Sequence, residues 1–522
     1  MPLKILTLNY NNKILIILLG VLSFYLNYHY GFIGVMPMDN TVLFNGGFRV
    51  LKGYTPFTDY WLVTGPLLDY LNAFFFKFLG ISWKSYIVHS SLFNSIFALA
   101  SYLVLNKIGL SQLFSFIYAL LISLLFYPVV GTPFVDHHST FFTVLGFYCL
   151  ILSLKTKNYN YCILIPIFLL FSFLSKQTPA AYGIITISVF ILIISYLLPT
   201  KRRQLLNKFI IGAAIAVALL IIFFLITKIN INEFFQQYIL FGSSIGGDRL
   251  SEYRFSLINE IIKFKFISYF IFFILIIAFI LRKKNKLSLE NLFILLLSIS
   301  LSVLLIFHQM ISMNQNFIFF LIPFLCGVAQ AFYNKAFSKD YFLVISLLIC
   351  LIAVSKYHLR FNEERKFNEL ENIDVSNFVE AKIIDKKLEG LRWITYLSPK
   401  NPKKEVDGIL EVINYLKKDK LKKILITDYQ IISPILNIYD NSPNQWHHPS
   451  VSFPLKSQKY YDTYKNYFIK KIKKYKIDYI FETRSDEKII TSLILNENCF
   501  TKQRISYLLI KIKLNLNCED LR

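Results

Sequence analysis

Long apolar runs recur along this chain of 522 residues and constrain its fold more than any other feature. Hydrophobic residues make up 55% of the sequence, and a soluble core has no use for so many runs of about 18 residues or more. Because a lipid-exposed backbone must satisfy its own hydrogen bonds, these runs predict transmembrane α-helices. About eleven are expected, near residues 13–32, 83–105, 110–128, 139–154, 160–175, 179–198, 208–227, 266–281, 288–307, 317–333 and 341–357.

Basic residues at the ends of these runs indicate how the chain lies in the membrane. Lys4 and Lys13 place the N-terminus in the cytoplasm under the positive-inside rule. With an odd number of spans, the later clusters around Lys155, Arg202 and Arg282 fall on the same side. The first run lacks a clear cleavage site and is expected to remain as a span. Everything after about residue 357 is then expected outside, in the periplasm of a bacterial inner membrane.

Polar and aromatic residues mark a first outer segment, about residues 33–82. Within it, the stretch 66–80 carries Asp69, Asn72 and Lys77 among apolar residues and is too short to span comfortably. We expect it to form an amphipathic helix at the membrane interface. Residues 1–357, with this segment, are the predicted transmembrane module of an α-helical polytopic membrane protein.

Dense charge distinguishes residues 358–522, for which we expect a soluble α/β domain. Residues 446–448 (Trp-His-His) are expected in a surface turn of this domain. Cys499 and Cys518 can form a disulfide if the domain faces an oxidising compartment, whereas the other four cysteines lie in apolar runs and are expected to be packing residues. Periodicity predicts one helix and two buried strands here, at 406–417, 422–429 and 476–481.

The net charge of +24 raises the question of a nucleic-acid partner. Many basic residues stand at the ends of apolar runs, where they orient spans and contact anionic lipid headgroups. No zinc-finger, helix-turn-helix or RNA-binding pattern is present, so membrane lipids are expected partners and nucleic acid is not. A Walker loop and a dinucleotide fingerprint are also missing, which argues against nucleotide-driven chemistry.

Ionisable residues gather in the segments that the predicted topology places outside. Because charge in lipid is costly, such residues at the ends of membrane helices are candidates for function. Asp39 lies a few residues beyond the first span, where a carboxylate can meet a water-soluble reactant and act as a general base. The other candidates, for substrate or phosphate binding, are Arg49, Asp59, Asp136, His137, His138, Lys176, Gln177, Arg249 and His308.

Several of these residues also have purely structural interpretations. Asp136, His137 and His138 suggest a metal site, but adjacent residues at a helix start diverge by about 100° each and do not easily face one ion. Asp136 is also suited to cap a helix N-terminus. Lys176 either snorkels to the membrane surface or contacts a buried anion. Arg249 is equally suited to be a solvated loop charge.

Three motifs in the first 200 residues resemble those of a known enzyme family. An acid beyond the first span is followed by GYTPFTDY at 53–60 and GPLLDY at 65–70, and FLSKQTP at 173–179 carries a lysine in a turn. This arrangement is similar to the GT-C glycosyltransferases. It most resembles the group of protein O-mannosyltransferases and aminoarabinose transferases, which is glycosyltransferase family 39-like and includes a bacterial Rgt-like branch. Many relatives have an acidic pair at the start of the loop, whereas here Asp39 is followed by Asn40.

The resemblance implies transfer of a sugar from a polyprenyl-phosphate carrier to a hydroxyl acceptor, with inversion. Asp39 alone would be the base, because its neighbour Asn40 is not an acid. Lys176, with Arg49 and Arg249, would stabilise the departing lipid phosphate. The acceptor is a glycan, a lipid or a protein. No cofactor is predicted, and a divalent cation stays an open possibility.

Two other functions of multi-span proteins are alternatives to sugar transfer from a polyprenyl-phosphate carrier. A lipid-linked glycan polymerase or ligase would be expected to carry its essential Arg and His in a large late outer loop. A transporter or flippase for a polyprenyl-linked substrate would favour charges at mid-span and broken helices. Neither pattern matches an acid directly after the first span and polar residues at span ends.

Overall fold

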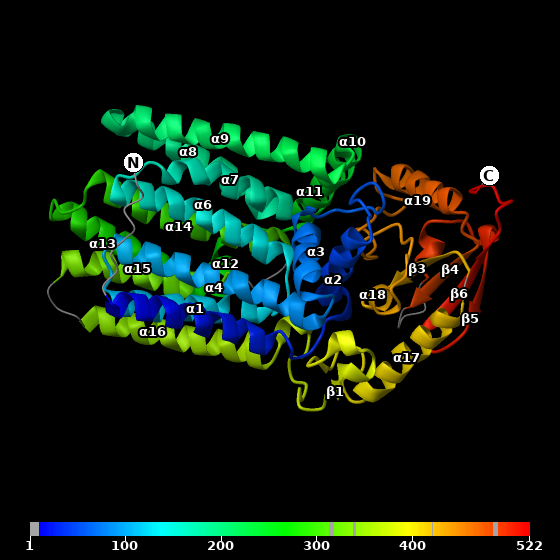
Figure 1. Cartoon of the computed structure of the whole chain (residues 1–522). Helices are drawn as coiled ribbons and strands as arrows, with labels where there is room; N and C mark the ends of the chain where they lie inside the picture. Colours follow the sequence, from blue (N-terminus) through cyan, green and yellow to red (C-terminus); the bar gives the residue numbers. More distant parts are fainter. Residues whose placement is uncertain (1–9, 313–317, 338–340, 420, 484–488, 522) are drawn as a thin grey trace.

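The computed structural model describes residues 10–312, 318–337, 341–419, 421–483 and 489–521, and it is drawn in Figure 1. An α-helix is present at each predicted apolar run. These helices lie side by side and form a bundle. They are α1 (Tyr10–Tyr30), α4 (Trp83–Ile108), α5 (Gln112–Leu125), α6 (Val135–Thr156), α7 (Tyr161–Ser175), α8 (Gln177–Leu197), α9 (Pro199–Thr227), α13 (Lys265–Lys283), α14 (Leu289–Ser312), α15 (Leu321–Ala336) and α16 (Tyr341–His358).

Nine of the helices in the described ranges are long and apolar enough to cross a membrane by length and composition. The remaining two at predicted positions, α7 and α15, have 15 and 16 residues. The structure therefore has the helices of a multi-pass membrane protein, and the expected number of eleven crossings stays a prediction. Four cysteines expected in apolar packing are buried and free, as predicted; they are Cys149, Cys162, Cys326 and Cys350.

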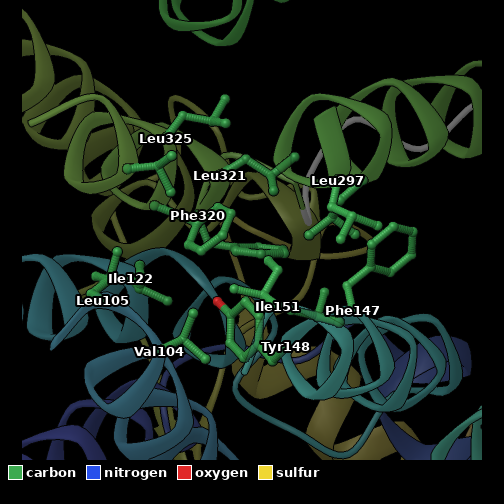
Figure 2. Close-up of a cluster of buried hydrophobic side chains, with 14 of the residues drawn as sticks. Val104, Leu105, Ile122, Phe147, Tyr148, Ile151, Leu297, Phe320, Leu321 and Leu325 are labelled. Carbon is green, nitrogen blue, oxygen red and sulfur yellow. The ribbon is translucent and has the colours of Figure 1, made fainter. Parts of the chain in front are cut away.

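Helix α15 lies at the centre of the bundle, where protein rather than lipid surrounds it. Every residue from 318 to 333 is buried. Figure 2 shows its Phe320, Leu321 and Leu325 facing side chains of four other helices. Those partners are Val104 and Leu105 of α4, Ile122 of α5, Phe147, Tyr148 and Ile151 of α6, and Leu297 of α14. The apolar side chains of α15 are therefore buried against protein and not against lipid.

Two helices of the first outer segment form a layer between the bundle and residues 359–522, which we call the C-terminal region (Figure 1). They are α2 (Pro37–Leu51) and α3 (Leu67–Leu79). The stretch 66–80 forms a helix, α3, which buries Asp69 and Asn72 while Phe74 and Phe78 stay exposed; its place at a membrane interface stays a prediction. A Cβ at Gly46 would come within 2.1 Å of the Asp69 carboxylate, so glycine there lets the two helices approach closely.

The motif GPLLDY at 65–70 brings the start of α3 against the end of α7. Gly65 N–H donates to the Ser175 carbonyl at 3.0 Å. A Cβ on Gly65 would lie 1.9 Å from the Leu174 carbonyl oxygen, which leaves no room for any other residue type. This contact holds the first outer segment beside the turn that carries Lys176.

Four short helical elements lie between α9 and α13, in the fourth predicted outer segment. They follow one another without a strand, and α11 buries none of its residues. They are α10 (Ile231–Phe234), the π-helical η2 (Phe235–Phe241), α11 (Gly242–Glu252) and α12 (Leu257–Lys263).

The C-terminal region contains a four-stranded sheet with helices beside it. The strand order is β3-β4-β6-β5, with β3 parallel to β4 and the other pairs antiparallel. The predicted helix and both predicted strands are confirmed as α17, β3 and β4. The elements are β3 (Lys423–Thr427), β4 (Tyr479–Thr483), β5 (Phe500–Arg504), β6 (Leu509–Leu514), α17 (Pro402–Lys418), α18 (Ile432–Leu436), α19 (Tyr461–Tyr475), and a small pair, β1 (Val379–Glu380) with β2 (Arg392–Trp393).

Cys499 and Cys518 form a disulfide across the end of this sheet, as the sequence suggested. The bond joins the residue before β5 to the tail after β6.

A buried arginine and a short backbone ladder join the C-terminal region to the bundle. Arg365 is 1% exposed, and its guanidinium donates to the carbonyls of Ile33, Pro128 and Val130 at 2.8–3.0 Å. Gly34 N–H donates to Arg392 O at 3.1 Å, and the ladder continues to residue 394. These contacts fix the chain that leads from α1 into α2.

Candidate functional site

Asp136, Lys176 and His308 form a compact group of charged side chains, which we call the ion group. Lys176 Nζ contacts both carboxylate oxygens of Asp136, at 2.6 and 2.7 Å. His308 Nε2 lies 3.0 Å from Asp136 Oδ1. The side chains of Asp136 and His308 are 4% and 1% exposed, against 21% for Lys176. A carboxylate this deeply buried needs such partners, because an unpaired buried charge is costly.

The ion group comes from the ends of three helices that are far apart in sequence. Asp136 lies in the first turn of α6, His308 in the last turns of α14, and Lys176 between α7 and α8. Lys176 and Thr178 have extended backbones, so the chain leaves α7 and turns before α8 continues. Ser139 Oγ donates to the Lys176 carbonyl at 3.2 Å and ties this turn to α6.

Asp39 lies in the first turn of α2 and interacts electrostatically with Asp136 and Lys176 of the ion group. Protein atoms surround its carboxyl although the side chain keeps some solvent contact. Burial raises the pKa of Asp39 to about 6, with further increases from Asp136 and Glu369 and an opposing effect of Lys176. Among the residues that the structure describes, no hydrogen-bond or ion-pair partner holds the Asp39 carboxylate. The Asp39 carboxylate therefore has a raised pKa and no partner among the described residues.

The neighbour of Asp39 has a structural role. Asn40 is 1% exposed, accepts from Met36 N–H at 2.7 Å and donates to Thr132 Oγ1 at 3.0 Å. It thereby caps the start of α2 and fastens it to the chain before α6. An aspartate there would replace the amide donor with an acceptor, so the Thr132 hydroxyl would have to donate instead.

Residues of the C-terminal region complete the surroundings of Asp39. Tyr396 has its pKa raised to about 12 by burial and by four carboxylates, among them Glu369, Asp428 and Asp39. Because Tyr396 of the C-terminal region interacts electrostatically with Asp39, this region contributes to the surroundings of the Asp39 carboxylate. Sequence reasoning missed Tyr396, Glu369 and Asp428, because their segments carry no motif.

Arg49 and Asp59 belong to the contact with the C-terminal region and lie apart from the ion group. Arg49 is 1% exposed, and its guanidinium donates to Asp440 at 2.8 and 3.2 Å and to the Asn444 carbonyl at 3.0 Å. Asp59 accepts from Thr55 N–H at 2.9 Å and lies 3.7 Å from Lys471 of α19. Arg49 thus has its donors engaged by protein and none of these bonds involves the ion group.

Gln177 and Arg249 also lie outside the ion group. Gln177 Nε2 donates to the carbonyls of Val63 and Tyr238, at 2.9 and 2.7 Å, and so joins the first outer segment to η2. Arg249 is half-buried on α11. No described residue forms an ion pair with it, and its predicted phosphate contact stays a prediction.

The two histidines after Asp136 face other directions, as the angular argument predicted. His137 Nε2 lies 3.1 Å from the Phe126 carbonyl. His138 Nε2 lies 3.0 Å from His89 Nε2, while its Nδ1 contacts the Tyr127 hydroxyl. His89 in turn lies 2.6 Å from Asn72 Oδ1. This buried chain of polar groups joins α3, α4 and α6, and only its histidine at 138 was a sequence candidate.

Capping and metal binding can be compared directly with the structure. The alternative interpretation of Asp136 as an N-cap is wrong: the cap position of α6 is Phe134, and no side chain caps it. The Asp136 side chain turns to Lys176 and His308 instead. Within the described ranges, no group of three or more His, Cys, Asp or Glu side chains is placed to hold a metal ion.

The segment 446–448, expected in a surface turn, is instead partly buried against the first outer segment. His447 is 1% exposed. Gln445 donates from its backbone to the Trp61 carbonyl at 3.2 Å and from its side chain to Asp69 at 2.7 Å. The expectation failed because Trp61, and Asp69 of α3, bond to Gln445, directly before this turn, and no local pattern reveals those contacts.

A shallow apolar groove of about 440 Å³ runs between α8 and α14 below the ion group. It begins at Phe307, next to His308, and at Tyr182, whose ring contacts that of Phe307 at 5.2 Å. The other lining residues are Ile185, Thr186, Ile299, Ser300, Val303 and Leu304. The same two helices therefore carry polar groups at their ends and an apolar groove along their lengths.

Comparison with known proteins gives no independent assignment of function. No protein-family model matches the chain, and a search of curated proteins finds no significant match.

The buried pair of Arg49 and Asp440 yields a prediction about stability. Arg49→Met removes the charge that compensates a carboxylate of 3% exposure, so we expect a loss of about 3 kcal/mol. Arg254→Met, at an exposed position, should change stability by no more than about 0.5 kcal/mol. Unfolding monitored in detergent compares the two. Equal stability of the two variants would contradict the role assigned to the pair.

Proposed function

We propose that this protein is an integral-membrane glycosyltransferase of the GT-C type that transfers a sugar from a polyprenyl-phosphate carrier to a hydroxyl acceptor, with inversion. One observation carries the proposal. Asp39, a carboxylate without a protein partner among the described residues, lies within electrostatic reach of the ion group, and an apolar groove begins at Phe307, next to His308 of that group. A base, an anion-binding group and a lipid-compatible surface then share one site.

Asp39 would act as the general base on the acceptor. The acceptor oxygen attacks the anomeric carbon as its proton passes to the Asp39 carboxylate, and the bond between that carbon and the phosphate oxygen breaks. The electron pair of that bond leaves with the lipid phosphate. A pKa of about 6 suits this role, because the carboxylate is then mostly ionised at neutral pH yet basic enough to hold a proton in transit.

Lys176 would stabilise the lipid phosphate as it leaves. An ammonium has three N–H donors, and the two Asp136 oxygens occupy two of them at 2.6 and 2.7 Å. The third remains for a phosphate oxygen. His308 donates to Asp136 and shares that carboxylate with Lys176. Because a phosphate leaves without a protonating acid, this scheme needs only one general base.

The groove between α8 and α14 would hold the first isoprene units of the donor. Its lining is mostly apolar, and it leads away from the ion group along two helices that are long and apolar enough to cross a membrane. Apolar burial of a polyprenyl chain there would set the phosphate at the helix ends, where Lys176 is placed. Charges at helix ends rather than at mid-span favour this function over the transporter alternative.

The orientation that fits this chemistry places the C-terminal region in the periplasm of a bacterial inner membrane, with the N-terminus in the cytoplasm. The disulfide of Cys499 and Cys518 supports it, because such bonds persist in oxidising compartments. Basic residues at the other ends of the helices fit the same orientation under the positive-inside rule. Lys155 lies in the last turn of α6 and Lys335 in the last turn of α15, and the two side chains are neighbours.

Replacing Asp39 by Asn tests the base directly. Asp39→Asn should lower turnover by at least about 100-fold while donor binding is kept, since only the proton acceptor is lost. The assay measures sugar transfer from a purified polyprenyl-phosphate sugar by full-length protein. Asp407→Asn is the matched control, an exposed carboxylate of α17, and should not affect turnover. Near wild-type turnover of Asp39→Asn would refute the mechanism.

Filling the groove tests the donor site independently of the base. Val303→Trp places a large ring in the groove and should raise KM for a long-chain donor by about tenfold, with a smaller effect on a donor of two isoprene units. Val344→Trp on α16 is the control, because Val344 and Val303 are 55% and 54% exposed. If the two variants respond identically, or if Val303→Trp affects both donors equally, the groove is not the binding site of the polyprenyl chain.

A further inference from the structure

A cavity lies where the bundle meets the C-terminal region, and Asp39 is not among its lining residues. Its volume is about 930 Å³. The end of α1 and the turn between α3 and α4 line one side, and residues 385–392 line the other. The cavity therefore spans the boundary between the membrane helices and the region beyond them, and the proposed transfer reaction has no use for it.

Three cations in this cavity have no ion-pair partner among the described residues. Lys84 and Lys386 are exposed, and each acts on Glu389 only at a distance. The guanidinium of Arg392 stacks on Phe378 at 5.3 Å and makes no ion pair with a described residue. We call Lys84, Lys386 and Arg392 the cation cluster.

The remaining charged side chains of the lining are already engaged. Lys387 Nζ donates to the carbonyls of Pro434 and Ile435 at 3.0 and 3.2 Å. Glu389 is paired with Lys382 at 2.6 Å, and Asp385 accepts from a backbone N–H at 2.8 Å. The two carboxylates thus have protein partners, whereas the cation cluster keeps its donors for a ligand. The lining carries four basic side chains against two acidic ones.

The membrane side of the cavity continues into a lipid-facing stripe. On α1, Ile14, Ile17, Val21 and Tyr25 are 48–66% exposed and recur at helical spacing. Tyr25 ends the stripe and also lines the cavity, together with Tyr28. Tyrosines are enriched at this depth of a membrane because the ring is apolar and the hydroxyl is wet. An apolar path thus ends directly beneath a positive cavity.

We propose that this cavity binds the headgroup of an anionic phospholipid, with its acyl chains along α1. The lipid phosphate would accept hydrogen bonds from the cation cluster, and the tyrosines would flank the glycerol backbone. Because the Arg392 backbone pairs with Phe32 and Gly34, a bound lipid also fastens the C-terminal region to the chain entering α2. The site does not rest on the transferase function and can be tested without turnover.

The test measures binding of phosphatidylglycerol to the full-length protein in detergent by native mass spectrometry. A triple variant, Lys84→Gln with Lys386→Gln and Arg392→Gln, should bind it about tenfold or more weakly, since each basic residue near an anionic lipid adds to the attraction. The matched control changes Lys417, Lys418 and Lys502 to Gln, three exposed lysines without a described ion pair, and should keep wild-type affinity.

Further arms distinguish the ligand and the cause. Phosphatidylcholine should bind both triple variants and wild type alike, and inorganic phosphate or glycerol phosphate alone should not compete. A charge-keeping variant, Lys84→Arg with Lys386→Arg, should retain phosphatidylglycerol, which separates loss of charge from loss of folding. Wild-type affinity in the cation-cluster variant would overturn the proposal. So would binding of free phosphate as tight as that of the lipid.

Discussion

The buried carboxylate of Asp136 is the constraint around which the membrane part of the site is arranged. A charge of this burial persists only with close partners, and Lys176 and His308 supply them from two other helices. To bring these partners together, α7 must stop at Ser175 and α14 must end beside the start of α6. The chain therefore leaves helical geometry at Lys176 and Thr178, and the turn is held there by Ser139 and Gly65.

A second layer of constraint explains why the first outer segment forms helices rather than a loose loop. Most of α2 and one face of α3 are buried, so the polar groups there must bond to protein. Arg49 bonds to Asp440, and Asp69 accepts from Tyr60 and Gln445. Burial raises the pKa of Asp69 to about 7, which marks the interior of this layer as poorly solvated. Burial also raises the pKa of Asp39, but no residue in the described part of the chain is a comparable partner for it.

Sequence patterns predicted those features that depend on local periodicity or on position relative to a span. The apolar runs, the amphipathic stretch that forms α3, and the strands β3 and β4 all have such signals. The predicted topology put Asp136, Lys176 and His308 on one face of the membrane with many other polar residues, but it did not predict that these three contact one another. Contacts such as that of Arg49 with Asp440, 391 residues away, could not be predicted because neither residue carries a motif. The same holds for Tyr396 and for the buried turn near His447.

The central claim is that Asp39 must be ionised for the reaction to occur, and the pH dependence of kcat/KM measures this most directly. The free protein needs the carboxylate form, so kcat/KM should rise with pH, reach half its plateau near the Asp39 pKa of about 6, and then level off. Substrate transfer by full-length protein from a polyprenyl-phosphate sugar provides the rate. A profile that stays flat or falls as pH rises through about 6 would contradict the account.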